Sequence, residues 1–219
     1  VLAPEARAWF VGVDLTDLSA PSPRPVDVAF MDRWRRVRFA RWDFSSDGAG
    51  LLPDEVLADG AVVAIDGPQG LASPGRKVRE GERELRCAGK TPDTLPAPGS
   101  GPYAGFLRGS VLLFTALRAK GLGVFGEVPP DQAVLLEVYP ADLWKKWAGH
   151  ALPKKQTAEG RRVRWELLRG QGLELPVDAA AITHDQLDAA AAALAAYLWA
   201  TGRTNAWGQA PRWDEGAGT

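Results

Sequence analysis

Five acidic side chains stand where they could together bind a divalent cation. Three end apolar runs and two open an alanine-rich segment near the C-terminus: Asp14, Asp66, Glu137, Asp185 and Asp188. A carboxylate at the end of a buried strand is costly unless a positive group compensates it. Carboxylates that converge from different segments most naturally hold a hard cation such as Mg²⁺ or Mn²⁺. Two such cations about 4 Å apart can activate water and stabilise the leaving oxygen in phosphodiester cleavage.

For these side chains to meet, the apolar runs before them must be neighbouring strands. Near-continuous apolar character predicts buried strands over 8–16, 61–66 and 133–139. Two strands with clearer alternation, over 26–31 and 34–43, follow the first through short connections, which predicts an antiparallel meander. The later strands alternate with helices and should pair in parallel through right-handed crossovers. Ligand sites gather at the carboxyl ends of such strands.

Helical periodicity predicts the elements that cover this sheet. The helices expected are 51–59, 103–120, 156–169 and 184–201. The fold class is therefore α/β, a five-stranded mixed sheet with its first three strands antiparallel and helices on both faces. No internal repeat or linker divides the sequence, so we expect a single domain over residues 1–219. A long loop or lid at about 70–102 and a loose tail at 203–219 would complete it.

The last predicted helix should present two carboxylates on neighbouring positions. Thr183 is the expected N-cap, and Gln186 three residues later completes a capping box. Asp185 and Asp188 then lie three residues apart in the first turns. Asp185 has an equally good structural interpretation, as an anion favoured near a helix N-terminus. Asp188 lies deeper, beside the apolar stripe, where capping explains it less well. Any one strand-end acid could likewise be a turn or surface carboxylate.

Two basic segments could hold the phosphates of a substrate. Residues 145–169 carry eight Lys or Arg against two Glu and include Trp147 and Trp165, with Trp144 just before them, and residues 76–90 carry six basic and three acidic residues. Clusters of cations among flat aromatic side chains suit a phosphate backbone with stackable bases. The alternatives are exposed helices with internal ion pairs and, favoured for the tryptophans, inward packing. The residues assigned to substrate binding are Arg79, Arg83, Arg86, Lys154, Lys155 and Arg161.

Composition limits the class of protein. Hydrophobic residues make up 46% and charged residues 24%, and the formal net charge of −1 argues against a uniformly basic nucleic-acid binder. Cys87 is the only cysteine, so we expect no internal disulfide and no zinc site built on several cysteines, which favours the cytoplasm. No apolar run approaches about 20 residues, and we see no signal peptide, so we expect no membrane segment.

Three weaker signals are discounted. Residues 121–126 match G-x-G-x-x-G but follow a predicted helix instead of a strand, so Gly121 is better explained as a helix C-cap. Cys87 beside Arg86 could be a thiol of lowered pKa, but no catalytic partner is evident and a packing role is favoured. His184 could contact a phosphate, although an exposed position in the first helical turn explains it better.

Five sequence blocks, in this order, are similar to those of a known family. They are V-G-V-D at 11–14, A-I-D-G-P-Q-G-L at 64–71, E-V-Y-P at 137–140, K-K-Q-T-A-E-G-R at 154–161 and D-Q-L-D-A at 185–189. The set resembles domain-of-unknown-function family 429, regarded as predicted RNase H-like nucleases, over about residues 9–202. The resemblance implies an RNase H-like fold and Mg²⁺- or Mn²⁺-dependent phosphodiester hydrolysis. The Asp-x-x-Asp pair also resembles that of Holliday-junction resolvases.

The sequence supports three hypotheses of function. The first is a nuclease that cuts DNA or RNA by a two-metal RNase H-like mechanism, with Asp14, Asp66, Glu137 and Asp188 catalytic and Asp185 as a further metal ligand. The second is a non-catalytic nucleic-acid-binding or scaffold protein on the same fold. The third is a phosphoryl-transfer enzyme acting on a small nucleotide, although the Gly-rich phosphate loop of such enzymes is missing from the sequence. The oligomeric state is left open.

Overall fold

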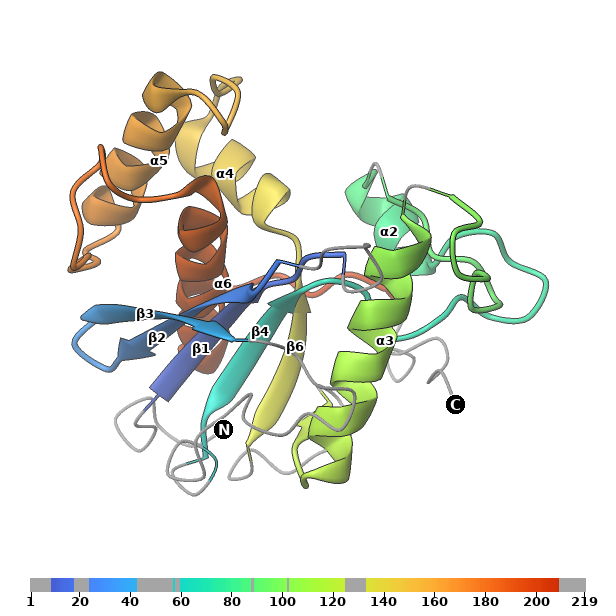
Figure 1. Ribbon diagram of the computed structural model, residues 1–219. Helices are drawn as coiled ribbons and strands as arrows, with labels where there is room; N and C mark the ends of the chain where they lie inside the picture. Colours follow the sequence, from blue (N-terminus) through green and yellow to red (C-terminus); the bar gives the residue numbers. More distant parts are fainter. Residues whose placement is uncertain are drawn as a thin grey trace.

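A computed structural model shows a mixed β-sheet between helices (Figure 1). The described residues are 9–17, 24–42, 57, 60–87, 89–101, 103–124 and 133–208. Within them the strands are β1 (Trp9–Asp14), β2 (Val26–Asp32), β3 (Val37–Trp42), β4 (Val62–Asp66), β5 (Gly123–Val124) and β6 (Val134–Val138). Their order across the sheet is β3-β2-β1-β4-β6-β5.

The strand β1 joins two halves of the sheet that differ in strand direction. On one side β1 pairs antiparallel with β2, which pairs antiparallel with β3. On the other side β1 pairs parallel with β4, β4 with β6, and β6 with β5. The five strands expected from the sequence are present. The two-residue strand β5 was not expected, because its two residues are too short a run to show a period.

Five helices accompany the sheet in the described part of the chain. They are α2 (Glu80–Leu85), α3 (Ala104–Ala119), α4 (Pro140–Ala148), α5 (Ala158–Gly170) and α6 (His184–Ala200). The expected helix 51–59 lies outside the described residues except for Leu57. Helix α4 was not predicted, although Pro140 at its first turn and Gly149 just after its end, with φ of 68°, mark both of its limits. None of these helices is long and apolar enough to cross a membrane.

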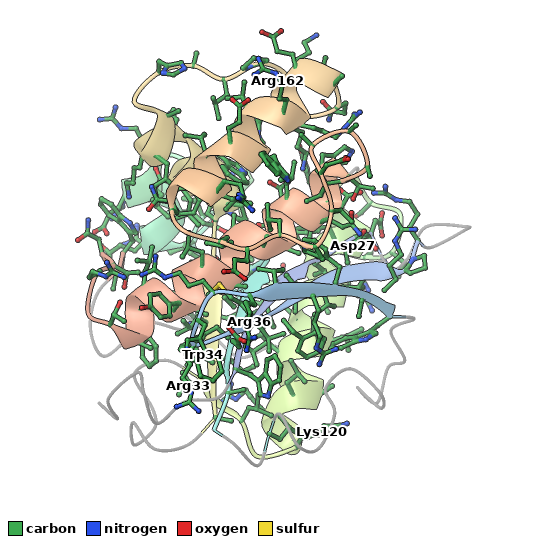
Figure 2. All side chains as sticks on the ribbon, turned by 90° about the vertical axis from the view of Figure 1, so that its left-hand side faces the viewer. Asp27, Arg33, Trp34, Arg36, Lys120 and Arg162 are labelled. Carbon is green, nitrogen blue, oxygen red and sulfur yellow. The ribbon has the colours of Figure 1, made fainter. Side chains whose placement is uncertain are left out.

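The sheet separates two hydrophobic layers. Figure 2 shows the sheet edge-on between α6 and α3, with α5 packed outside α6. Alternate residues of β1 serve the two layers: Phe10 belongs to the layer with α6, and Val11 and Val13 belong to the layer with α3. Asp14 continues the face of Phe10 and Gly12, so its side chain is directed to the α6 side.

Helix α6 approaches β1 closely because both surfaces carry small residues. The run from Ala189 to Ala196 is buried throughout, with Leu194 its one larger side chain. A Cβ added at Gly12 would lie 1.9 Å from the carbonyl oxygen of Ala189 and 2.3 Å from the nitrogen of Ala193. Glycine is therefore required at position 12, and it sets the distance between the strand that carries Asp14 and the helix that carries Asp188.

Candidate metal centre

Two of the predicted carboxylates lie side by side at the edge of the sheet. The parallel register pairs Asp14 of β1 with Asp66 of β4. Paired residues on neighbouring strands point to the same face, so both carboxylates are directed to α6. The next position in this row is Val138, so β6 contributes no carboxylate to it. Neither Asp14 nor Asp66 has an ion-pair or hydrogen-bond partner for its carboxylate within the described residues.

The N-terminal turns of α6 bring a second pair of carboxylates to this row. Thr183 caps the helix through its Oγ1, which accepts from the nitrogen of Gln186 at 3.0 Å, and the Gln186 side chain returns the bond to Thr183. The predicted capping box is therefore confirmed. It fixes Asp185 in the first turn and buries Asp188, which is 3% exposed. Asp66, Asp185 and Asp188 each repel Asp14 electrostatically, and Asp188 also repels Asp66.

Burial and repulsion between carboxylates raise the pKa values of Asp14 and Asp66. Burial, followed by repulsion from Asp188 and Asp66, raises the pKa of Asp14 well above its usual range. Burial, followed by repulsion from Asp188, raises the pKa of Asp66 to about 7. Lys155 acts in the opposite direction on both groups but does not cancel these effects. Asp66 is therefore partly protonated near neutral pH when no further cation is present.

Asp188 is held by two donors from outside its own helix. The Trp144 indole N–H donates to Oδ1 at 2.6 Å, and the Lys155 ammonium lies 2.5 Å from Oδ2. Burial opposes the charge on Lys155, but Asp188, Asp14 and Asp185 together outweigh burial and the pKa of Lys155 is raised. Lys155 is therefore a cation that the protein itself supplies to Asp188. The role of Trp144 was not predicted, because its helix was not predicted.

The turn that presents Lys155 is locally determined. Thr157 caps α5, and its Oγ1 accepts from the nitrogen of Gly160 at 3.0 Å. A Cβ at Gly160 would lie 2.0 Å from the carbonyl oxygen of Lys154, so glycine is needed for the chain to fold back at this point. The block K-K-Q-T-A-E-G thus positions one lysine at the carboxylates and leaves Lys154 exposed.

Asp185 and Asp27 lie at the border of the cluster. Asp27 was not predicted as a site residue. Arg24 donates to Asp185 at 3.2 Å, and His184 Nδ1 lies 2.7 Å from Asp185 without hydrogen-bond alignment. Asp27 pairs with Asp14 in the antiparallel register and so belongs to the same row. Burial raises the pKa of Asp27, and its ion pair with Arg41, at 3.2 Å, offsets this only in part. The signal for Asp27 was a single acid inside an otherwise apolar strand.

Glu137 does not join the row, contrary to the expectation from its strand-end position. It pairs with Ile65, whose side chain belongs to the layer beneath α3, so it is directed to the opposite face of the sheet. There Arg79 binds both of its oxygens, one at 2.6 Å, and the nitrogen of Gln69 donates to it at 2.9 Å. Arg79 is itself buried and also contacts Glu82 at 3.2 Å. Arg79 and Glu137 therefore form an ion pair on the α3 side of the sheet.

The other residues assigned to substrate binding are dispersed. Arg83 pairs with Glu80 at 3.0 Å, and Arg86 lies just after α2 in a left-handed conformation with φ of 56°. Arg161 donates to the carbonyl oxygen of Gln156 at 2.8 Å. Trp144, just before the basic segment 145–169, is buried, in agreement with the inward packing favoured for the tryptophans. Arg164, within that segment, is buried and donates to the carbonyl oxygens of Pro153 and Gly160.

Cys87 behaves as a packing residue. Burial, followed by the charges of Glu82 and Glu137, raises the pKa of its thiol to about 11. A thiol with such a pKa is almost fully protonated at neutral pH and is a poor nucleophile. The raised pKa favours the packing role over an activated thiol.

The carboxylates fit a divalent cation by their chemistry. Oxygen donors alone, burial and a deficit of positive charge are the conditions that Mg²⁺ and Mn²⁺ require. Within the described residues no three acidic, histidine or cysteine side chains are close enough to hold a cation as they stand. Both oxygens of Asp188 are bound, one by Trp144 and the other by Lys155. A cation would have to exchange with the lysine.

Comparison with known proteins places the chain in a family. The model described as "Protein of unknown function (DUF429)" matches residues 28–212, and the chain belongs to this family. No curated protein and no solved structure matches it. The family expected from the five sequence blocks is therefore confirmed. Its description gives no activity, so function must be argued from the site.

Proposed function

We propose that the protein is an RNase H-like nuclease that hydrolyses phosphodiester bonds of DNA or RNA with Mg²⁺ or Mn²⁺. The observation that carries this proposal is the register pair of Asp14 and Asp66, directed to the capped N-terminus of α6 with Asp185 and Asp188. Two unpaired, partly or fully buried carboxylates are unfavourable in a protein that uses them only for structure. They are useful in a site that accepts a cation.

Four residues would hold the cation or cations: Asp14, Asp66, Asp185 and Asp188. Glu137 is left out, because its oxygens are bound by Arg79 on the other face. When bound, the cation activates water and stabilises negative charge on the phosphate. Trp144 keeps Asp188 oriented through one oxygen. The Lys155 side chain is 38% exposed, so its ammonium can move from Asp188 to a phosphate oxygen of the substrate.

Substitution of Asp14 tests the proposal. With Mn²⁺, the wild-type protein should cleave single- or double-stranded oligonucleotides, and Asp14→Asn should lower the rate by more than about 100-fold because a direct ligand is removed. The fold should be retained, since the change removes a charge that Asp66 and Asp188 repel. Glu166→Gln, an exposed acid paired with Arg162 at 2.7 Å, is the matched control and should cleave normally. Equal cleavage by both variants would refute the proposal.

A second candidate function is supported by Lys155. Because its ammonium already lies 2.5 Å from Asp188, the site is partly neutralised without metal. A non-catalytic nucleic-acid-binding protein could keep the Lys155–Asp188 ion pair permanently and bind no metal. Such a protein would bind oligonucleotides equally in EDTA and in Mn²⁺ and would cut none of them.

A further inference from the structure

A cavity of about 540 Å³ opens beside Asp66. The C-terminal ends of β4 and β6, helix α4, the end of α6 with the segment after it, and the region of α2 line it. Figure 1 shows α4 and α2 standing at this same end of the sheet. The volume is that of a site for a small organic molecule or a nucleobase. Of the four proposed cation ligands, Asp66 is the one that lines it.

The walls of this cavity carry aromatic side chains with exposed surface. Trp207 is 41% exposed and Tyr103 is 61% exposed, and both line the cavity with Trp147. In the described part of the chain only Trp34 and Leu112 are comparably exposed large hydrophobic residues. Aromatic rings that remain accessible inside a concave site are suited to stacking with a flat ligand.

The wall that carries Trp207 is built by specific contacts. The nitrogen of Gly208 donates to Glu84 of α2 at 2.9 Å. A Cβ at Gly81 would lie 3.2 Å from the carbonyl oxygen of Trp207, so glycine in α2 lets the two segments approach. Residues 203–208, expected as part of a loose tail, therefore lie against α2 and close one side of the cavity.

The charged residues of the cavity favour a ligand that combines a flat ring with a phosphate. Lys90, Lys146 and Arg203 line it and are exposed, which places cations at its rim. The Lys146 ammonium lies 5.2 Å from the centre of the Trp207 ring. Asp66 lies at the other limit, where the cavity meets the carboxylate cluster. Lys146 also pairs with Asp142 at 2.5 Å, and a phosphate at the rim would add a second anionic partner for it.

We propose that the cavity receives one unstacked base of a nucleic-acid strand whose phosphate lies at the carboxylate cluster. The inference rests on the proposed nuclease function, since the base in the cavity would be the one next to the phosphate that is cut. Stacking on Trp207 and Trp147 would hold the base without reading its identity. The substrate class is thereby narrowed to single-stranded, flapped or unpaired nucleic acid.

Binding measurements without cleavage test this proposal. In an Asp14→Asn background, the fluorescence anisotropy of a labelled single-stranded DNA oligonucleotide is compared with that of an abasic oligonucleotide of the same length. Adding Trp207→Ala should weaken binding of the base-bearing strand about tenfold and leave the abasic strand unchanged. Trp34→Ala is the matched control: Trp34 is 62% exposed and flanked by Arg33 and Arg36 at the β2–β3 turn, outside the cavity (Figure 2). It should bind both strands as the background does.

The outcomes separate this inference from the nuclease proposal. No loss in Trp207→Ala, equal losses in Trp207→Ala and Trp34→Ala, or an equal loss for the abasic strand would overturn the cavity assignment, whatever the cleavage assay shows. A crystal soaked with 5-bromodeoxyuridine monophosphate gives a second readout. A bromine anomalous peak between Trp147 and Trp207 supports the assignment, and a peak elsewhere contradicts it. Base binding without cleavage in the wild-type protein would refute only the nuclease.

Discussion

At the scale of single residues, the carboxylates of this protein differ in what compensates their charge. Asp27 has Arg41, Glu137 has Arg79, and Asp188 has Lys155. Asp14 and Asp66 have no such partner in the described structure, and burial with repulsion from neighbouring carboxylates raises their pKa values. Position in the sequence predicted Asp14, Asp66, Glu137 and Asp188 alike, and it did not predict Asp27. Their partners, which come from distant segments, decide which of them remain free to bind a cation.

The raised pKa of Asp66 predicts how stability depends on pH in the absence of metal. The folded pKa of about 7 exceeds the ordinary value of 3.8, so between these values the folded state holds a proton that the unfolded state has lost. The free energy of unfolding in EDTA should therefore fall as the pH rises from about 4 to 7 and change little from this group above that. Urea denaturation at several pH values measures it. Asp66→Asn should flatten the fall, and an unchanged slope would contradict the assignment.

The same ionisation predicts the pH dependence of metal binding. Mn²⁺ competes with protons for Asp14 and Asp66, so its affinity should rise between pH 6 and 8 as Asp66 ionises at a pKa of about 7. Isothermal titration with MnCl₂ across this range measures the affinity. A constant affinity would show that the cation binds elsewhere.

Substitution of Glu137 separates the structural ion pair from the metal site. Glu137→Gln leaves the buried Arg79 with Glu82 as its remaining charged partner, and the free energy of unfolding should fall by roughly 3 kcal/mol. Mn²⁺ affinity should stay within about twofold of wild type, since Glu137 lies on the opposite face from Asp14. Urea denaturation and MnCl₂ titration give the two values. Loss of Mn²⁺ binding with unchanged stability would return Glu137 to the ligand set.

At the scale of elements, local signals predicted most of the architecture. Apolar runs predicted the strands, and Thr183 with Gln186 predicted the start of α6, because hydrophobic periodicity and helix capping are properties of residues close together in the sequence. The face of Glu137 was not predictable in this way. A shift of one residue between β4 and β6 decides whether its side chain points to α6 or α3, and register is set by the whole sheet.

The contact between α6 and β1 makes a prediction at this scale. Gly12→Ala would place a methyl group against the backbone of Ala189 and Ala193, so α6 must move away from the strand. The free energy of unfolding should fall by about 3 kcal/mol or more. Mn²⁺ binding should weaken as well, because Asp188 moves away from Asp14.

Gly170→Ala is the control for this prediction. Gly170 ends α5, is exposed, and has open space where a Cβ would be added. The change should be neutral or stabilising by up to about 1 kcal/mol. Similar effects of the two substitutions in urea denaturation would contradict the role given to Gly12.

At the scale of the whole molecule, the two faces of the sheet carry different groups of charged residues. The α6 face carries the carboxylate cluster, and the α3 face carries the Arg79–Glu137 ion pair that holds the α2 region in place. The segment expected as a lid and the residues after α6 come together to enclose a cavity. Composition could not predict that cavity, since its walls come from parts of the chain that are far apart in sequence.

Cation binding by the carboxylate cluster is tested by a crystal of the full chain grown or soaked with MnCl₂ above neutral pH, with data collected at the manganese absorption edge. We expect an anomalous peak between Asp14 and Asp66, with Asp188 among its ligands and the Lys155 ammonium displaced. We expect no peak in Asp14→Asn. An empty cluster in the wild-type crystal, with Lys155 still on Asp188, would contradict the central claim that this protein binds a catalytic cation.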